Sequence, residues 1–290
     1  MSSKLTSPSE IRRILDENGL RPKKRLGQNF LADANVLGKI ISAAEISPDD
    51  FVLEIGPGLG TLSRELARTA KKLVCVETDR DMVSILHKTL SEFANVEIVE
   101  SDFLRLKLDQ FLGRYFGDQK CTVLGNLPYY ITTPLISILV ESKNLINRMV
   151  LMVQKEVAQR LAAKPAENDY SSFGIYVNYN CRFEIIAKVP RTVFYPAPEV
   201  DSALIKLEPR SEPAVKTKDE AKFFEVVRAA FGKRRKTLLN ALSSSENLNI
   251  NRNEAADILQ RAGIEPSRRG ETLTMEEYAL TADIISESGH

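Results

Sequence analysis

The sequence predicts an α/β protein: a mostly parallel, doubly wound sheet of seven strands followed by a small all-helical domain. From Asp50 to about Lys155, short apolar runs alternate with amphipathic helical patterns, which is typical of a parallel sheet. Between Pro209 and Lys218, Ser, Pro and charged residues replace this periodicity, and the chain beyond has only helical spacing. The 290 residues can therefore be divided into three predicted parts. These are a flexible N-terminal segment over 1–20, a main domain over 21–209 and a helical domain over 210–290.

Each predicted strand is a short run of mostly apolar residues that ends at a turn signal or a polar residue. The strands are 51–55, 73–76, 96–99, 121–125, 149–153, 183–189 and 202–207. Leu62 and Leu66, one turn apart, indicate a helix over 61–69 after a glycine-rich turn. Other helical patterns cover 36–44, 79–92, 223–231, 236–242, 253–262 and 275–285. The loop 190–201 contains three prolines and is predicted to be stiff and extended.

The composition excludes several classes of protein. No run approaches the roughly 18 apolar residues that a membrane helix needs, and residues 1–10 lack the apolar core of a secretory signal. Cys75, Cys121 and Cys181 are far apart and predict reduced thiols rather than a disulfide. With two histidines and no clustered cysteines, no metal site is expected. We expect a cytoplasmic protein.

The net charge of +1 hides an uneven distribution of basic residues. Two positive blocks on a nearly neutral chain favour a surface that binds a polyanion such as RNA, although solvated charge runs are the alternative. The predicted RNA-binding residues are Arg21, Lys23, Lys24, Arg25, Lys233, Arg234, Arg235 and Lys236.

The loop Glu54-Ile55-Gly56-Pro57-Gly58-Leu59-Gly60 lies between a predicted strand and helix, as a nucleotide-binding loop does. Its spacing is not that of a dinucleotide fold, and Pro57 removes a backbone donor that a pyrophosphate would use. Glu77, at the end of the next strand, can accept both hydroxyls of a ribose. Asp102, after the third strand, can accept from an adenine amine. Ribose, adenine and no phosphate site predict S-adenosylmethionine, although both acids could simply cap helices.

Asn126-Leu127-Pro128-Tyr129 follows the apolar strand 121–125 at the sheet edge where ligands bind. The Asn126 side-chain oxygen and the Leu127 carbonyl can accept from the amine of a base, and Pro128 makes the turn rigid. Tyr129 can stack on one face of the base and Phe194 on the other, with core packing as the alternative for both rings. The predicted reaction is therefore methyl transfer to a base amine, for which positioning matters more than a strong base.

Taken together, these motifs resemble those of the ribosomal RNA adenine dimethyltransferases, which methylate adenines near the 3′ end of small-subunit rRNA. The resemblance runs from about Arg21 to the C-terminus and is carried by seven motifs. They are Leu26-Gly27-Gln28-Asn29-Phe30-Leu31, Glu54-Ile55-Gly56-Pro57-Gly58, Glu77, Ser101-Asp102, Asn126-Leu127-Pro128-Tyr129, Phe194-Tyr195-Pro196-Ala197-Pro198-Glu199-Val200-Asp201-Ser202 and Phe231-Gly232-Lys233-Arg234-Arg235-Lys236-Thr237-Leu238-Leu239-Asn240.

The resemblance implies a Rossmann-like class I methyltransferase that dimethylates the N6 amines of two adjacent adenosines during ribosome biogenesis. It implies that Asn29 and Leu31 close over the cofactor and that Gly56 lies against it. It also implies that Asn126 contacts both the methyl donor's surroundings and the target amine.

The expected partner is small-subunit (16S) rRNA in the immature 30S subunit, with no membrane association, and the protein is expected to be a monomer. Two alternatives stay open. One is a large-subunit rRNA adenine methyltransferase of the macrolide-resistance type, and the other is a non-catalytic ribosome-assembly or RNA-binding factor on the same fold.

Overall fold

The computed structural model describes residues 5–233 and 235–288, which form two compact units. The first unit comprises the chain up to Ala158 together with Arg182–Pro209, and the second comprises Gln159–Cys181 and the chain from Arg210 onward. The segment Gln159–Cys181 was expected in the main domain. It belongs to the second unit because its side chains, such as Tyr179, are buried in the helical core there.

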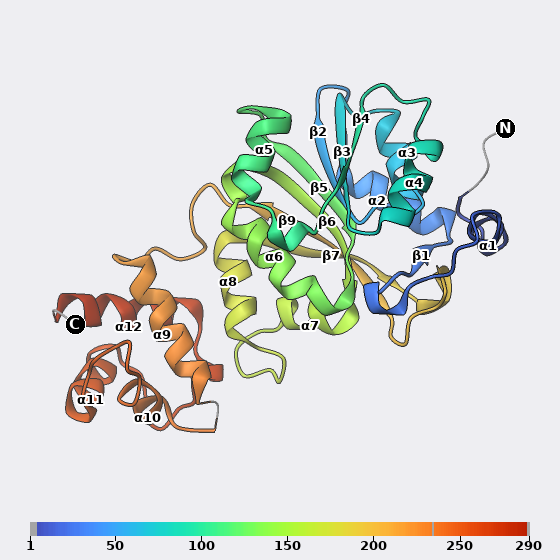
Figure 1. The fold of residues 1–290 in the computed structure, drawn as a ribbon. Coiled ribbons are helices and arrows are strands. Elements are labelled where there is room, and N and C mark those ends of the chain that lie inside the picture. Colours follow the sequence, from blue (N-terminus) through green and yellow to red (C-terminus); the bar gives the residue numbers. More distant parts are fainter. Residues whose placement is uncertain (1–4, 234, 289–290) are drawn as a thin grey trace. The chain divides into compact units, whose positions relative to one another are not determined.

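As predicted, the first unit is built on a seven-stranded, mostly parallel sheet (Figure 1). The strand order is β4-β3-β2-β5-β6-β9-β7. Adjacent strands from β4 to β6 are parallel, and β9 is antiparallel to β6. The strands are β2 Phe51–Ile55, β3 Lys72–Glu77, β4 Val96–Glu100, β5 Cys121–Asn126, β6 Ile146–Gln154, β7 Cys181–Val189 and β9 Ser202–Pro209. The carboxyl ends of β2, β3 and β5 coincide, because Ile55 pairs with both Val76 and Gly125.

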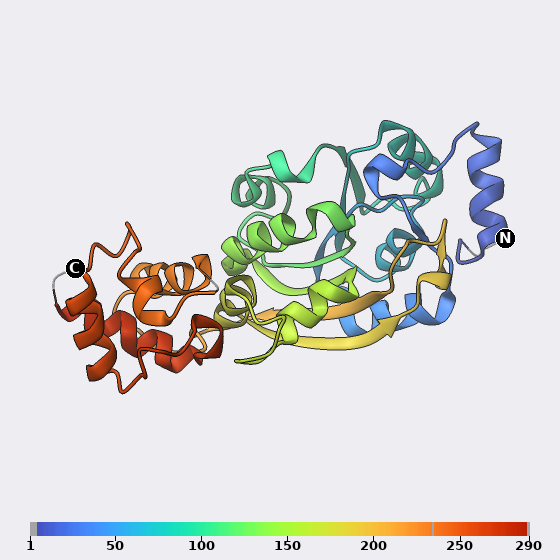
Figure 2. The same cartoon turned by 90° about the horizontal axis from the view of Figure 1, so that it is seen from below.

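Helices cover both faces of this sheet, with α2 and α3 on one side and α5 and α6 on the other (Figures 1 and 2). Apolar side chains of α2 and α3 share one buried cluster with alternate residues of the strands, including Val52 and Leu124. The helices of this unit are α1 Pro8–Glu17, α2 Ala34–Ala44, α3 Thr61–Ala67, α4 Arg80–Thr89, α5 Leu108–Phe116 and α6 Thr132–Glu141. Helix α7, Lys155–Ala162, runs across the division between the units.

Helix α1 lies within the segment 1–20 that was expected to be flexible. Ser7 caps its first turn by accepting from the Glu10 N–H at 3.2 Å, and Pro8 opens the helix. Ile11 and Leu15, one turn apart, are 0% and 2% exposed and pack in a cluster with Phe30. The described part of this segment is therefore ordered by burial of a short apolar stripe.

The second unit is all-helical apart from the first residue of β7, as predicted for the C-terminal region. Its helices are α8 Ser172–Asn180, α9 Glu220–Gly232, α10 Leu238–Leu242, α11 Arg252–Arg261 and α12 Met275–Glu287. The rings of Tyr179 and Phe223 stack in its core with centroids 4.9 Å apart. Tyr278 is fully buried, and its hydroxyl donates to the Gly270 carbonyl at 2.7 Å.

Candidate functional site

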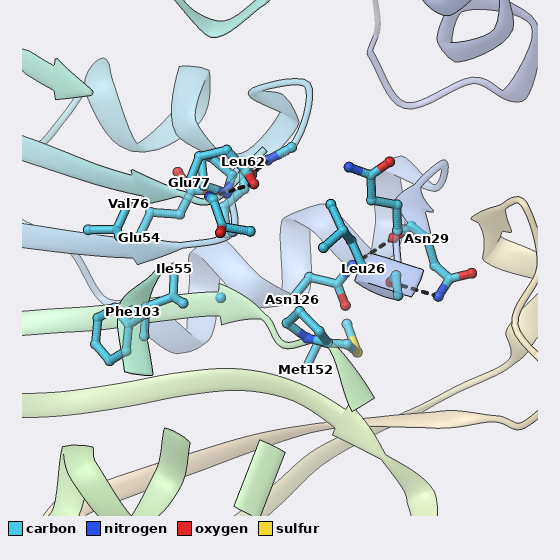
Figure 3. A pocket seen from close by; sticks show the side chains of 18 of the residues that line it. Leu26, Asn29, Glu54, Ile55, Leu62, Val76, Glu77, Phe103, Asn126 and Met152 are labelled. Atoms are coloured by element: carbon cyan, nitrogen blue, oxygen red, sulfur yellow. Dashed lines mark hydrogen bonds between the residues drawn. The ribbon is translucent and has the colours of Figure 1, made fainter. Parts of the chain in front are cut away.

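A cavity of about 280 Å³ lies at the carboxyl edge of the sheet in the first unit (Figure 3). Its lining comes from the ends of β2, β3 and β5, the residues that follow β4, and the segment 26–31. Such an edge is where ligands bind in open α/β sheets. None of the described residues that line the cavity is Lys, Arg or His, whereas Glu54, Glu77 and Asp102 all contribute to it. The cavity is therefore acidic.

The glycine-rich loop passes close to the cavity because three of its residues adopt left-handed backbone angles. The φ angles of Gly56, Gly58 and Gly60 are 67°, 59° and 84°. A Cβ atom on Gly58 would lie 3.1 Å from the ring of Phe30, so a larger residue would push against the opposite wall. The Gly58 N–H donates to Glu77 at 3.2 Å, which ties the loop to the end of β3.

Glu77 is held rigidly by backbone donors. Oε1 accepts from the N–H groups of Thr78 and Asp79 at 2.9 Å each, and Oε2 accepts from Gly58. The side chain is buried, and this burial raises the pKa of Glu77 despite the three donors, which lower it. The cap of the next helix, α4, is Asp79 rather than Glu77. Glu77 therefore has no capping role that would explain its place at the cavity.

Glu54 is a second buried carboxyl group at this edge, one residue before the end of β2. It is 2% exposed, and burial raises its pKa to about 7. The thiol of Cys75, the residue paired with it on β3, donates to Oε2 at 3.7 Å. Glu54 and Glu77 thus place two buried carboxyl groups with raised pKa values in one cavity.

Asp102 is in a more open position than Glu77. One oxygen accepts from the Leu104 N–H at 3.1 Å and caps the short helix Phe103–Arg105, and the other lies 3.4 Å from Arg105 Nε. The side chain is 44% exposed. Asp102 therefore combines the helix-capping role with a place in the cavity wall, next to Phe103.

Asn126 ends β5 and meets the N-terminal segment across the cavity. Its Nδ2 donates to the backbone carbonyl of Asn29 at 2.8 Å, while Asn29 Nδ2 donates to the Gly27 carbonyl at 3.0 Å (Figure 3). One N–H of the Asn126 amide is thereby engaged, which turns the nitrogen toward Asn29 and leaves Oδ1 to accept a hydrogen bond. Leu127 is buried, with its N–H donating to Met152, and Pro128 lines the cavity.

The two predicted stacking rings do not line the cavity in this structure. The Tyr129 hydroxyl hydrogen-bonds the Ser202 hydroxyl at 2.7 Å, and burial raises the pKa of Tyr129. Phe194 is 4% exposed and packs in a hydrophobic cluster with Leu31. For Phe194 the cause is strand pairing: β1, Phe30–Leu31, is antiparallel to β8, Phe194–Tyr195, so that Leu31 and Phe194 are partners.

Tyr130, rather than Tyr129, is the tyrosine of this motif that lines the cavity, although the sequence does not single it out. Its side chain is 61% exposed. A Cβ atom built on Gly27 would lie 3.7 Å from its ring, so the ring lies beside the N-terminal segment. Two adjacent tyrosines after an Asn-x-Pro motif were the available signal, but the sequence could not tell which of them faces the cavity.

The basic residues of the first block differ from one another in their partners. Arg21, Lys24 and Arg25 are exposed and form no ion pair within residues 5–233 and 235–288. Lys23 Nζ instead lies 2.6 Å from both Asp79 and Asp81. The prediction that Lys23 is a free RNA-binding cation is therefore not supported, because two carboxylates already neutralise it.

The second basic block lies in the turn between α9 and α10 of the second unit. Lys233, Arg235 and Lys236 are exposed, and Arg234 lies outside the described residues. The turn is closed by the Lys236 N–H, which donates to the Lys233 carbonyl at 2.8 Å.

Two further findings bear on function. In the described part of the chain, no group of three or more His, Cys, Asp or Glu side chains is placed to hold a metal ion. No helix among residues 5–233 and 235–288 has the length and apolarity that a membrane crossing requires.

Comparisons with known proteins agree on one kind of relative. The model of a family described as ribosomal RNA adenine dimethylase matches residues 19–281. Ribosomal RNA small subunit methyltransferase A from Alkaliphilus metalliredigens is 46% identical, and the match covers 98% of this chain and 99% of that protein. The protein of the same name from a Geobacillus species is also 46% identical, with the same coverage of both chains.

Two solved structures have similar folds and identities above 25%. A dimethyladenosine transferase from Plasmodium falciparum is 28% identical with a TM-score of 0.75, and the match covers 89% of this chain and 98% of that one. The 23S rRNA methyltransferase ErmE is 26% identical with a TM-score of 0.69, and the match covers 89% of this chain and all of that one.

Proposed function

The chain belongs to the ribosomal RNA adenine dimethylase family, and on this premise we propose that it dimethylates two adjacent adenosines near the 3′ end of small-subunit rRNA. The methyl groups come from S-adenosylmethionine, and the product is N6,N6-dimethyladenosine. The observation that carries the proposal is the orientation of Asn126. Its nitrogen is engaged by the Asn29 carbonyl, so its oxygen is presented to an incoming amine.

The residues of the cavity fit S-adenosylmethionine better than a phosphate-bearing cofactor. The described lining has buried carboxyl groups and no basic side chain, which suits a ligand with a sulfonium and an ammonium group. Glu77 would hold the ribose hydroxyls and Asp102 the adenine amine, while Gly56, Asn29 and Leu31 would lie against the cofactor. When bound, the cofactor supplies an electrophilic methyl group.

The residues after β5 would prepare the adenine amine for attack. The amine is a weak nucleophile because its lone pair is delocalised into the ring. Asn126 Oδ1 and the Leu127 carbonyl would accept hydrogen bonds from the two N–H groups of the amine. These bonds would direct the nitrogen lone pair toward the methyl group. In each transfer the cofactor would supply the methyl group and keep the electron pair of its S–CH₃ bond, one N–CH₃ bond would form, and one amine proton would leave to solvent.

The structure supports Tyr129 and Phe194 unequally as residues that stack on the target base. Tyr129 would stack on one face of the base, although its ring does not line the cavity; the hydroxyl bond to Ser202 holds that ring. Phe194 could form the second wall only if its ring were uncovered, because it is 4% exposed and packed with Leu31. Base stacking on one aromatic side chain is worth about 1–3 kcal/mol.

The polymer substrate we propose is the rRNA of an immature 30S subunit, bound by a monomer in the cytoplasm. Arg21, Lys24 and Arg25 in the first unit, and the turn Lys233–Lys236 in the second, would contact phosphate groups. The described side chains among these are exposed, as phosphate-binding cations must be.

The test is methyl transfer to defined ribosomal particles. Purified protein and labelled cofactor are incubated with undermethylated 30S particles and, in parallel, with 50S particles. We expect label in two adjacent adenosines of the 30S rRNA as dimethyladenosine. Label in 50S rRNA alone would support the large-subunit alternative, and no label in either particle would leave only a non-catalytic assembly role.

A further inference from the structure

A partly buried polar network anchors the N-terminal arm, which we define as residues 21–31. Gln28 is at its centre and uses both ends of its amide. Nε2 donates to Asp79 Oδ2 at 2.6 Å, and Oε1 accepts from the Lys23 backbone N–H at 2.8 Å. Lys23 Nζ in turn donates to Asp79 Oδ1 and to Asp81 Oδ2 at 2.6 Å each. The arm is therefore tied at two points to the first turn of α4.

Asp79 receives the side-chain donors of both Gln28 and Lys23 in a nearly closed site. Its residue is 4% exposed, and its Oδ1 also caps α4 by accepting from the Asp81 N–H at 3.1 Å. Burial alone would raise the pKa of Asp79, but the hydrogen bonds from Lys23 and Gln28 outweigh it and lower the pKa. A buried carboxylate with every oxygen bonded allows its partners little freedom of position.

The N-terminal arm also contacts Asn126, the residue whose side-chain oxygen would accept from the target amine. Asn29 follows Gln28 directly, and its carbonyl accepts from Asn126 Nδ2. Without that carbonyl, the Asn126 carboxamide could rotate and present its NH₂ group, a donor, where an acceptor is required. The place of the Asn29 carbonyl depends on where the network holds Gln28.

We propose that Gln28, Asp79 and Lys23 are positioning residues for methyl transfer, which hold the arm so that the Asn29 carbonyl orients the Asn126 carboxamide. This inference rests on the proposed function and deepens it. It also removes Lys23 from the RNA-binding residues: Lys23 is paired with Asp79 and Asp81, whereas its neighbours Lys24 and Arg25 are exposed. Displacement of the amide by about 1 Å is enough to lower kcat by about 100-fold.

The test exchanges the polarity of one hydrogen bond. Gln28→Glu places a second carboxylate against Asp79, and Asp79→Asn places an NH₂ group against Gln28 Nε2, so each single change breaks the contact. In the double variant, the new carboxylate at position 28 accepts from the new amide at position 79 and still accepts from the Lys23 N–H. The amide oxygen at position 79 can still accept from Lys23 and from the Asp81 N–H.

We expect each single variant to lower kcat for methylation of 30S particles by about 10- to 100-fold, with RNA affinity unchanged. The double variant should recover most of kcat. The matched control is Gln119→Glu, an exposed position that gains the same charge outside the network. Lys23→Met should lower kcat, and its control is Lys39→Met on the exposed surface of α2.

Three outcomes would overturn the inference. The double variant could stay as slow as the singles although all variants unfold at the same temperature as wild type. The singles could lose thermal stability but keep kcat, which would indicate a purely structural network. Lys23→Met could weaken RNA binding and leave kcat intact. Failure of the wild-type protein to methylate 30S particles would instead refute the proposed function, so the two failures are distinguishable.

Discussion

The cavity of the first unit and the basic turn of the second differ in how their functional groups are held. In the cavity, Glu77 accepts three backbone hydrogen bonds and the Asn126 amide is fixed by Asn29. In the turn between α9 and α10, the described cations Lys233, Arg235 and Lys236 are exposed. One region depends on geometry and burial, and the other depends on the number of charges.

This difference predicts different responses to mutation, pH and salt. Removing one group from a preorganised site removes an oriented dipole that water cannot replace, so single changes should have large effects. Removing one cation from an exposed set removes one screened phosphate contact, so effects should be small, nearly additive and dependent on salt.

The largest expected effect is that of Asn126→Ala. The change removes the oxygen that accepts from the adenine amine, and kcat should fall by about 10²- to 10³-fold, as when one preorganised hydrogen-bonding group is removed. Single-turnover methylation of 30S particles measures it, and RNA affinity measured by filter binding serves as the control. A variant within about threefold of the wild-type rate would mean that the amide does not orient the target.

The variant Glu54→Gln tests the raised pKa of the buried Glu54 through the pH dependence of protein stability. Burial raises the pKa of Glu54 from 4.5 to about 7, so the native state keeps a proton that the unfolded chain releases. Because the native state binds more protons, the free energy of unfolding falls as pH rises from 4.5 to 7. Above about pH 7, the raised pKa of Glu54 lowers the free energy of unfolding by about 3 kcal/mol.

Gln at position 54 carries no such cost, so the variant should be more stable than wild type at about pH 8 and should lose this advantage near about pH 4.5. Urea unfolding at both pH values measures the difference, and the exposed Glu184→Gln is the control. An equal difference between variant and wild type at both pH values would show that the pKa of Glu54 is the same in the native state and in the unfolded chain.

Glu77→Gln and Asp102→Asn compare two acids of one cavity. Glu77 is 7% exposed and held by three backbone donors, whereas the Asp102 side chain is 44% exposed. We expect Glu77→Gln to weaken S-adenosylmethionine binding by about 10- to 100-fold, because charged hydrogen bonds are worth about 1.5–3 kcal/mol when buried. Asp102→Asn should weaken it by less than about 10-fold. Calorimetry on the free protein measures both, and a larger effect of Asp102→Asn would reverse this ranking.

The sequence predicts the sheet and its carboxyl edge well, because both follow from local patterns. The strand expected at 51–55 is β2, Phe51–Ile55. Because a parallel sheet brings the carboxyl ends of its strands together, Glu77 and Asn126 lie in one cavity. Periodicity does not reveal β1 and β8, since each has only two residues. Their pairing brings Leu31 against Phe194, and this long-range contact buries a ring that was expected to face a base.

Basic residues illustrate the same limit, because charge blocks in a sequence do not reveal partners that are distant in the chain. Lys23 is 56 residues from Asp79 and pairs with it, while the adjacent Lys24 stays exposed. Only the structure separates the two. Sequence therefore predicts where chemistry occurs on this fold better than it predicts which cation binds RNA.

The smallest expected effect per residue belongs to the basic turn. Changing Lys233, Arg235 and Lys236 together to Gln should weaken binding to 30S rRNA. The plot of log binding constant against log salt concentration should become less steep, by about 0.7–1 for each phosphate that is no longer neutralised. S-adenosylmethionine affinity should not change, because the cavity lies wholly within the first unit. The matched control is Lys39, Lys107 and Lys120 changed together to Gln, which removes three exposed charges elsewhere. If both triple variants lower the slope equally, the protein attracts RNA through its total charge, and the turn is not a specific contact.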